Sequence, residues 1–256
     1  MTEKLNITRI FNAIWELYKA HAGVLLTTAF VIYLAAAILI GVFFIIAPIL
    51  ALLAVIAIFV AQFWYTGMVI ELVKRVQARE PVPTVGTLFG AVSPVLGRLI
   101  GAGLLAGLGI VVGLILLIVP GLYLITIWAV IAPVIVIEGA RVGESFGRSQ
   151  NLVKGNGWPV FGTLVIIFIL NAAVSSVLQT IFGRDTFLGG LLGTLIPNLI
   201  FAPVGALAVS VLYFELRRVK EVAGAPVAPA VAGGPAGAPV APAPQQAPPS
   251  PPPPAQ

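Results

Sequence analysis

The sequence predicts an all-α membrane protein, a polytopic transmembrane helical bundle with six spans arranged as three helical hairpins. Of its 256 residues, 59% are hydrophobic and only 9% are charged, and the mean hydropathy is +1.09. Soluble domains carry roughly a quarter charged residues. Long stretches contain no Asp, Glu, Lys or Arg, and one span needs about 20 apolar residues. Basic residues return only between alternate apolar stretches, which predicts both termini in the cytoplasm.

The first hairpin follows an amphipathic segment, residues 7–19. Ile7, Ile10 and Ile14 have helical spacing, with Arg9 and Glu16 on the opposite face. We expect this segment to be an interfacial helix on the inner membrane surface. Spans at about 22–47 and 49–72 follow, because the charge-free stretch is too long for one helix and contains Pro48.

The second and third hairpins follow the same order. Val85, Leu88 and Val92 repeat the amphipathic spacing before spans at 97–119 and 121–138, which Pro120-Gly121 separates. A weaker interfacial segment, 142–154, precedes spans at 157–181 and 189–214. Residues 1–221 are therefore expected to form the six-span domain. Residues 222–256 are rich in Ala and Pro and are predicted to be a disordered cytoplasmic tail.

Lys and Arg give the orientation, because short cytoplasmic loops carry an excess of them. With the N-terminus inside, Arg184 is the only base on the outer side. The cytoplasmic bases are then Lys4, Arg9, Lys19, Lys74, Arg75, Arg79, Arg98, Arg141, Arg148, Lys154, Arg217, Arg218 and Lys220.

Each even-numbered span ends in a Glu with a base three residues later. The pairs are Glu71 with Lys74, Glu138 with Arg141, and Glu215 with Arg218. An i,i+3 pair shares one helical face and contributes only a few tenths of a kcal/mol when exposed. The pattern indicates a threefold repeat, which is common in transport folds. Chance is an alternative to the repeat, because charges must resume where an apolar run ends. A separate hypothesis is that the three Glu converge near the cytoplasmic face as a cation or proton site, and the other interpretation is that each is neutralised by its basic neighbour.

Two asparagines interrupt the apolar runs of the last hairpin. Asn171 and Asn198 each lie nine or ten residues from the outer end of their span, so both are expected roughly 15 Å below the outer boundary. They form a candidate intramembrane polar pair. One interpretation is a packing clamp between helices, and the other is a substrate-lining role. Pro197 and Pro203 form a candidate hinge in the sixth span, with a static kink as the alternative.

Glycines of the third span allow close helix contact. Their small-xxx-small spacing serves either packing within the chain or formation of a homodimer. The residues are Gly97, Gly101, Gly103, Gly107, Gly109 and Gly113.

The residue types exclude most familiar catalytic centres. The chain has no cysteine and one histidine, His21, so Cys–His pairs, Cys-ligated metals and two-His zinc motifs cannot form. It also lacks a P-loop motif. We expect no catalytic residue, no metal and no cofactor. The bases form no dense patch, so nucleic acid is not an expected partner.

The stretch from Val119 to Gly162 resembles the prokaryotic membrane-domain family named after glycerophosphoryl diester phosphodiesterases. The resemblance is carried by Pro120-Gly121, Pro133, Glu138, Arg148-Ser149 and Lys154-Gly155, and by the closing Tyr213-Phe214-Glu215-Leu216-Arg217. It implies a stand-alone membrane domain of unknown activity. The family's soluble phosphodiesterase domain has no counterpart here, so its chemistry is not carried over.

Two functions are expected from these features. The first is a non-enzymatic membrane protein, a scaffold or accessory that organises partners or lipids at the inner face. The second is a small transporter or lipid-translocating protein. The expected partners are the lipid bilayer and either a second copy or an unidentified membrane or cytoplasmic protein. The expected location is a prokaryotic plasma membrane, as a multi-pass protein.

Overall fold

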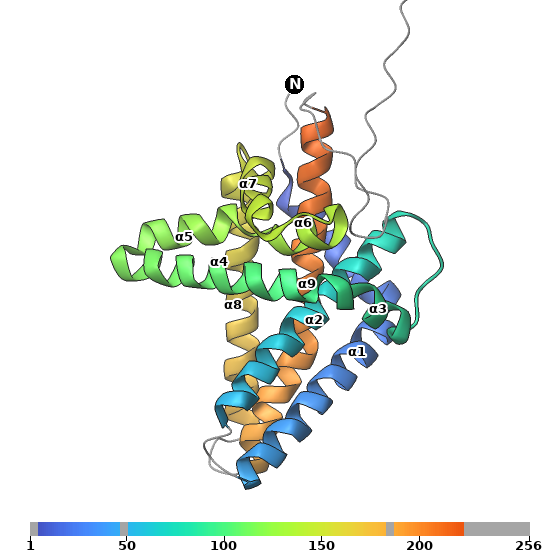
Figure 1. The fold of residues 1–256 in the computed structure, drawn as a ribbon, viewed down its shortest axis with the longest axis vertical. Helices are drawn as coiled ribbons and strands as arrows, with labels where there is room; N and C mark the ends of the chain where they lie inside the picture. The colour runs from blue at the N-terminus through green and yellow to red at the C-terminus, as the bar shows by residue number, and fades with distance from the viewer. Residues whose placement is uncertain (1–4, 47–50, 183–186, 223–256) are drawn as a thin grey trace, which may run out of the picture.

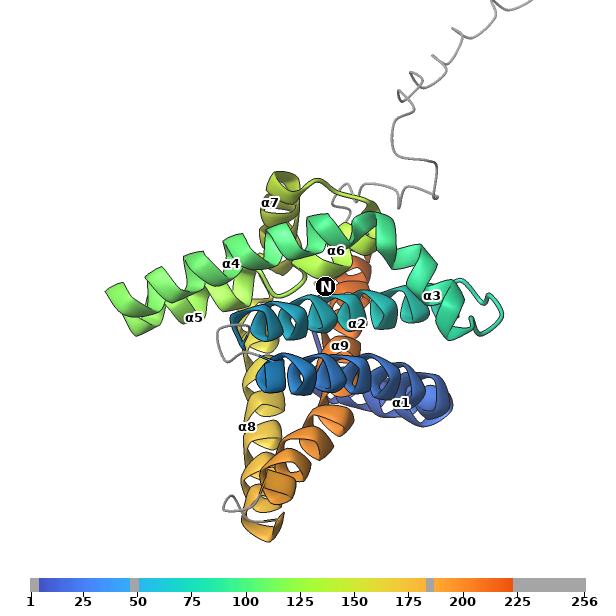
Figure 2. The ribbon, with the colours of Figure 1, turned by 60° about the horizontal axis from the view of Figure 1, so that its bottom comes forward.

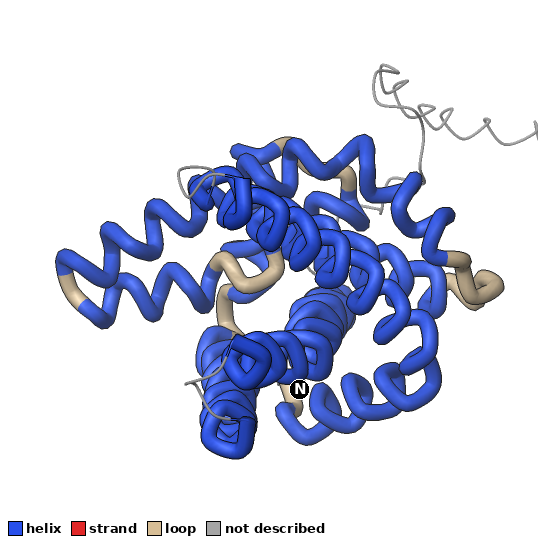
Figure 3. Tube along the Cα trace, turned by 90° about the horizontal axis from the view of Figure 1, so that it is seen from below, coloured by secondary structure: helices blue, strands red, loops and turns tan. Residues whose placement is uncertain are grey.

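A computed structural model describes residues 5–46, 51–182 and 187–222, and all regular structure in these ranges is helical (Figure 3). Within these ranges, six segments are long and apolar enough to cross a bilayer, which indicates a multi-pass membrane protein. The turns expected near Pro48 and at 183–185, and the tail beyond 222, lie outside the described residues. The helices are α1 (Ile7–Ile46), α2 (Ala51–Gln77), α3 (Val85–Val92), the 3₁₀ turn η2 (Ser93–Val95), α4 (Leu96–Leu116), α5 (Ile118–Ile127), α6 (Ile131–Glu138), α7 (Val142–Val153), α8 (Gly157–Phe182) and α9 (Phe187–Val222).

The first interfacial segment and the first span are two helices that meet at a kink within α1. His21 interrupts it with φ −122° and ψ 17°, and its Nδ1 lies 3.2 Å from the carbonyl oxygen of Leu17. Ile10 and Ile14 are buried in the protein, and α1 packs along α9. The apolar face of residues 7–19 is therefore covered by protein at these positions, whereas Trp15 is exposed.

The fourth span, predicted over 121–138, is interrupted within its length, because α5 ends at Ile127 and α6 begins at Ile131. Pro133 has no N–H to continue the ladder from α5 into α6. Ser149 of α7 satisfies backbone groups at the break: its Oγ donates to the carbonyl oxygen of Ile127 (2.8 Å) and accepts from the N–H of Val130 (3.3 Å). Ser149 is fully buried. The interruption is thus stabilised by a side chain from another helix.

Three helical pairs diverge from a common core. α1 packs on α2, α4 on α5 and α8 on α9, and α9 also contacts α1 and α2. The α4–α5 pair lies crosswise to α8 (Figures 1 and 2). The six apolar segments therefore do not run parallel as in the bundle that the sequence predicts. The core lies where the pairs meet and includes Tyr65, Met68, Ile135, Leu212 and Tyr213.

Glycines let α4 approach its neighbours closely. A Cβ on Gly103 would lie 2.0 Å from the ring of Phe63 in α2, and one on Gly109 would lie 2.8 Å from the Trp128 ring. Gly107 has open space around it. Gly103 and Gly109 therefore serve packing within the chain.

Candidate functional site

A cavity of about 300 Å³ lies between α2, α8 and α9. Its polar lining consists of Gln62, Thr66, Asn171 and Asn198. The structure thus places both asparagines predicted from the sequence on one cavity. Gln62 and Asn198 are exposed and Asn171 is half-buried, so the cavity is open at the protein surface.

The three amides lie at matching positions along their helices. Gln62 is eleven residues after the start of α2, Asn198 is eleven after the start of α9, and Asn171 is eleven before the end of α8. At 1.5 Å per residue, each lies about 16 Å from the helix end that is expected on the outer side. Gln62 and Thr66 were not singled out from the sequence, because the second span was located only by its lack of charged residues. The same count of residues would have found them.

Hydrogen bonds occupy some of the polar groups of the cavity. The hydroxyl of Tyr33 donates to Gln62 Oε1, the Thr66 hydroxyl donates to the Gln62 carbonyl oxygen (2.8 Å), and the Ser175 hydroxyl donates to Asn171 Oδ1 (3.2 Å). Within the described parts of the chain, Gln62 Nε2 and Asn171 Nδ2 donate to no protein acceptor. Two amide donors are therefore free to bind water or a ligand at this depth.

The candidate hinge lies on the same helix as Asn198. Pro197 and Pro203 are both inside α9, and both are buried. Proline has no N–H to donate a helical hydrogen bond to the carbonyl four residues earlier, so Pro203 leaves the carbonyl of Leu199 without this bond. The ribbon of α9 bends along its length (Figures 1 and 2). The prolines therefore place a weakened stretch of α9 beside the cavity wall.

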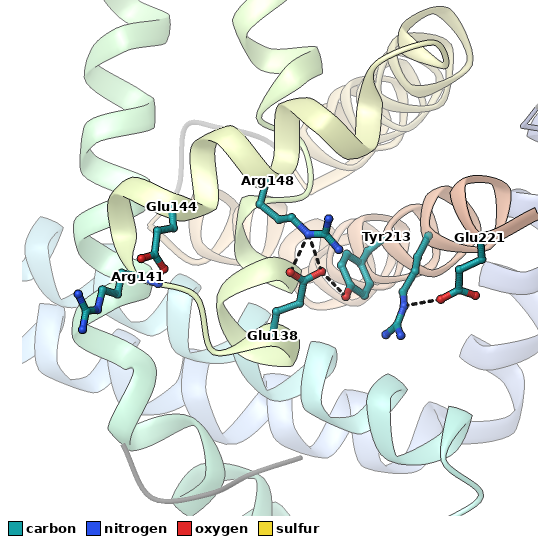
Figure 4. Close-up of polar contacts among 7 residues, drawn as sticks. Glu138, Arg141, Glu144, Arg148, Tyr213 and Glu221 are labelled. Carbon is teal, nitrogen blue, oxygen red and sulfur yellow. Dashed lines mark hydrogen bonds and ion pairs between the residues drawn. The ribbon is translucent and has the colours of Figure 1, made fainter. Parts of the chain in front are cut away.

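A second polar cluster joins α6, α7 and α9 (Figure 4). Arg148 Nε donates to both carboxylate oxygens of Glu138, at 2.8 and 3.2 Å, and the Tyr213 hydroxyl donates to Glu138 Oε1 at 2.8 Å. Tyr213 is fully buried. One carboxylate thus holds three helices together by charge-assisted hydrogen bonds.

The pairing of Glu138 with Arg141 predicted from the sequence is not formed. Gly139 ends α6 in the left-handed conformation, with φ 69°, so Arg141 does not continue the helical face of Glu138. The backbone N–H of Arg141 instead donates to Glu144 Oε2 (3.2 Å) at the start of α7. The partner of Glu138 is Arg148, ten residues away, which sequence spacing alone did not indicate.

The other two glutamates pair within their own helices. Glu71 lies 3.2 Å from Lys74 and 2.9 Å from Arg75, and Glu215 lies 3.4 Å from Arg218. Glu215 is also 3.7 Å from Arg9 of α1. Each of the three glutamates therefore has its own base, and among the residues described the carboxylates form no group that could hold a metal ion.

No family model, curated protein or solved structure matches the chain. The resemblance to the phosphodiesterase-associated membrane-domain family stays a prediction.

Proposed function

We propose that the chain is a small transporter or lipid-translocating protein, the second of the two functions expected from its sequence. The single observation that carries this proposal is the cavity lined by Gln62, Thr66, Asn171 and Asn198 inside otherwise apolar segments. Polar groups at bilayer depth are costly unless a partner or water satisfies them. A polar substrate group passing through the cavity would satisfy the free amide donors.

The ends of the described chain support the proposed orientation. Arg9 near the start of α1 contacts Glu215 near the end of α9, and Lys220 Nζ donates to the carbonyl oxygen of Lys154 (2.8 Å). The two ends therefore lie on one side of the protein. The excess of Lys and Arg at this side supports an N-in, C-in arrangement, with the cavity about midway between the faces.

Flux through reconstituted protein tests the proposal. The full chain is placed in liposomes, and the movement of uncharged solutes and of fluorescent lipids is measured. We expect Asn171→Leu and Asn198→Leu each to lower flux at least about tenfold, the effect of a loss of about 1.4 kcal/mol in substrate stabilisation. Thr180→Val, a polar-to-apolar change on α8 outside the cavity, should leave flux unchanged. Normal flux in both asparagine variants would contradict the proposal.

A second candidate function is organisation of a partner at the inner face. It is supported by α7, which exposes Glu144 and Gln150, with exposed Arg141 at its N-cap, while Ser145 and Ser149 on its other side are buried. Folded wild-type protein that moves no solute and no lipid would favour this second function.

A further inference from the structure

The side chains at the polar end of the cavity match an uncharged ligand. These side chains are amides and one hydroxyl, and among the described residues none that lines the cavity is ionisable. A charged group held against these amides would find no opposite charge in the lining and would lose part of its hydration, which costs more free energy than holding an uncharged polar group there. Gln62 Nε2 and Asn171 Nδ2 offer donors, so the matching ligand group carries acceptors such as hydroxyl or carbonyl oxygens.

The rest of the cavity is apolar and continues along one face of α9. Phe201, Ala202, Gly205, Ala206 and Val209 line it, with the spacing of a single helical face. The twelve residues from Asn198 to Val209 extend over about 16 Å. A Cβ on Gly205 would meet nothing within 4 Å, so there is open space beside this residue in the apolar part of the cavity. Its lining matches a hydrocarbon segment.

We infer that the cavity binds an uncharged amphiphile, with a hydroxyl- or carbonyl-bearing group against Gln62 and Asn171 and an apolar segment along α9. This inference rests on the proposed function for the location of the site and adds the chemical class of the ligand. A headgroup attached to an acyl chain and a free polyol share the polar chemistry. Only the headgroup attached to an acyl chain also fills the apolar half of the cavity.

Protection of a single cysteine tests the inference, because the natural chain contains none. The full chain with Thr66→Cys is labelled with N-ethylmaleimide in lipid nanodiscs, with and without each probe. The probes are 1-decanoylglycerol, glycerol, decyl phosphate and decyltrimethylammonium. Gly107→Cys, on an exposed part of α4 with open space around it, is the matched control.

We expect 1-decanoylglycerol at tenfold above its dissociation constant to slow labelling of the Thr66→Cys variant on the order of tenfold. Glycerol and both charged amphiphiles should slow it less than about twofold, and no probe should affect the Gly107→Cys variant. Adding Gly205→Leu to Thr66→Cys fills the apolar half without changing the polar one. It should abolish protection, measured for each variant as the ratio of its own labelling rates without and with the probe.

Equal protection by a charged amphiphile or by glycerol would overturn the inference, as would absence of protection by 1-decanoylglycerol. Flux without such protection contradicts the ligand class and leaves the proposed transport intact. Protection without flux supports the ligand class and contradicts transport.

Discussion

Replacing Ser149 with alanine removes the side chain that satisfies the break between α5 and α6. The serine hydroxyl is fully buried and bonds two backbone groups, the carbonyl of Ile127 and the N–H of Val130. A buried polar group left without a partner costs about 1–3 kcal/mol. The two groups together predict a loss of roughly 2–6 kcal/mol in the free energy of unfolding, with the lower part of that range applying if water enters the gap.

A matched serine separates this effect from the general effect of the substitution. Ser210 is also fully buried, and its hydroxyl donates to the carbonyl oxygen of Ala206 four residues earlier in the same helix (2.7 Å). That carbonyl keeps its helical backbone bond when the hydroxyl is removed. Ser210→Ala should therefore cost less than about 1 kcal/mol.

Equilibrium unfolding in mixed micelles measures both variants. The full chain is titrated with sodium dodecyl sulfate, and unfolding is followed by tryptophan fluorescence, with Trp128 located at the break itself. We expect a clearly lower midpoint for Ser149→Ala than for Ser210→Ala. Equal midpoints for the two variants would refute the interpretation that Ser149 stabilises the break.

Two further predictions use the same titration. Gly103→Ala should destabilise the protein by about 1–3 kcal/mol, because its new Cβ would overlap the Phe63 ring. Gly107→Ala, in open space, should leave stability unchanged or increase it by up to about 1 kcal/mol through helix propensity. Equal effects of the two substitutions would contradict the close packing of α4. Among the described residues the buried Thr28 hydroxyl has no hydrogen-bond partner, whereas that of Thr163 donates to a carbonyl at 2.8 Å. Thr28→Val should therefore stabilise the protein by about 1 kcal/mol, and Thr163→Val should destabilise it by less than about 1 kcal/mol. Shifts of the same sign would contradict this second contrast.

The sequence allowed the apolar segments to be counted because each reaches the length that a bilayer requires. The depth of polar residues in the membrane could also be estimated from the sequence. Counting residues from the span ends placed Asn171 and Asn198 at one level, and both line the cavity. The same count applied to uncharged polar residues of the second span would have added Gln62 and Thr66. The composition of a cavity wall is thus accessible from sequence when helix ends are known.

Contacts between distant segments were beyond such a count. The break after Ile127 depends on Ser149, and Glu138 pairs with Arg148 because Gly139 turns the chain away from the helical path of Arg141. Proline is ordinary in transmembrane helices, so Pro133 alone did not predict an interruption. The crosswise position of α4 and α5 likewise follows from tertiary packing, which the spacing of apolar residues does not encode (Figure 1).

Access of water to the cavity is the property on which transport depends. Thr66 lines the cavity, fifteen residues after the start of α2, and Phe168 lies fourteen residues before the end of α8 with 74% of its surface exposed. The two residues are therefore at similar depth, about 21–22 Å from the expected outer helix ends, but on different surfaces. In the cysteine-free chain, each position can carry the only thiol.

Reaction of these two thiols with a membrane-impermeant methanethiosulfonate reagent is the decisive comparison. The Thr66→Cys and Phe168→Cys variants are reconstituted in liposomes, and the initial rate of modification from the aqueous phase is measured for each. A water-filled cavity predicts that the Thr66→Cys variant reacts at least about a hundredfold faster, because a thiol facing hydrocarbon is shielded from a charged reagent. Equal, slow rates at both positions would show that the cavity does not admit water, and would contradict its role as a path for polar groups.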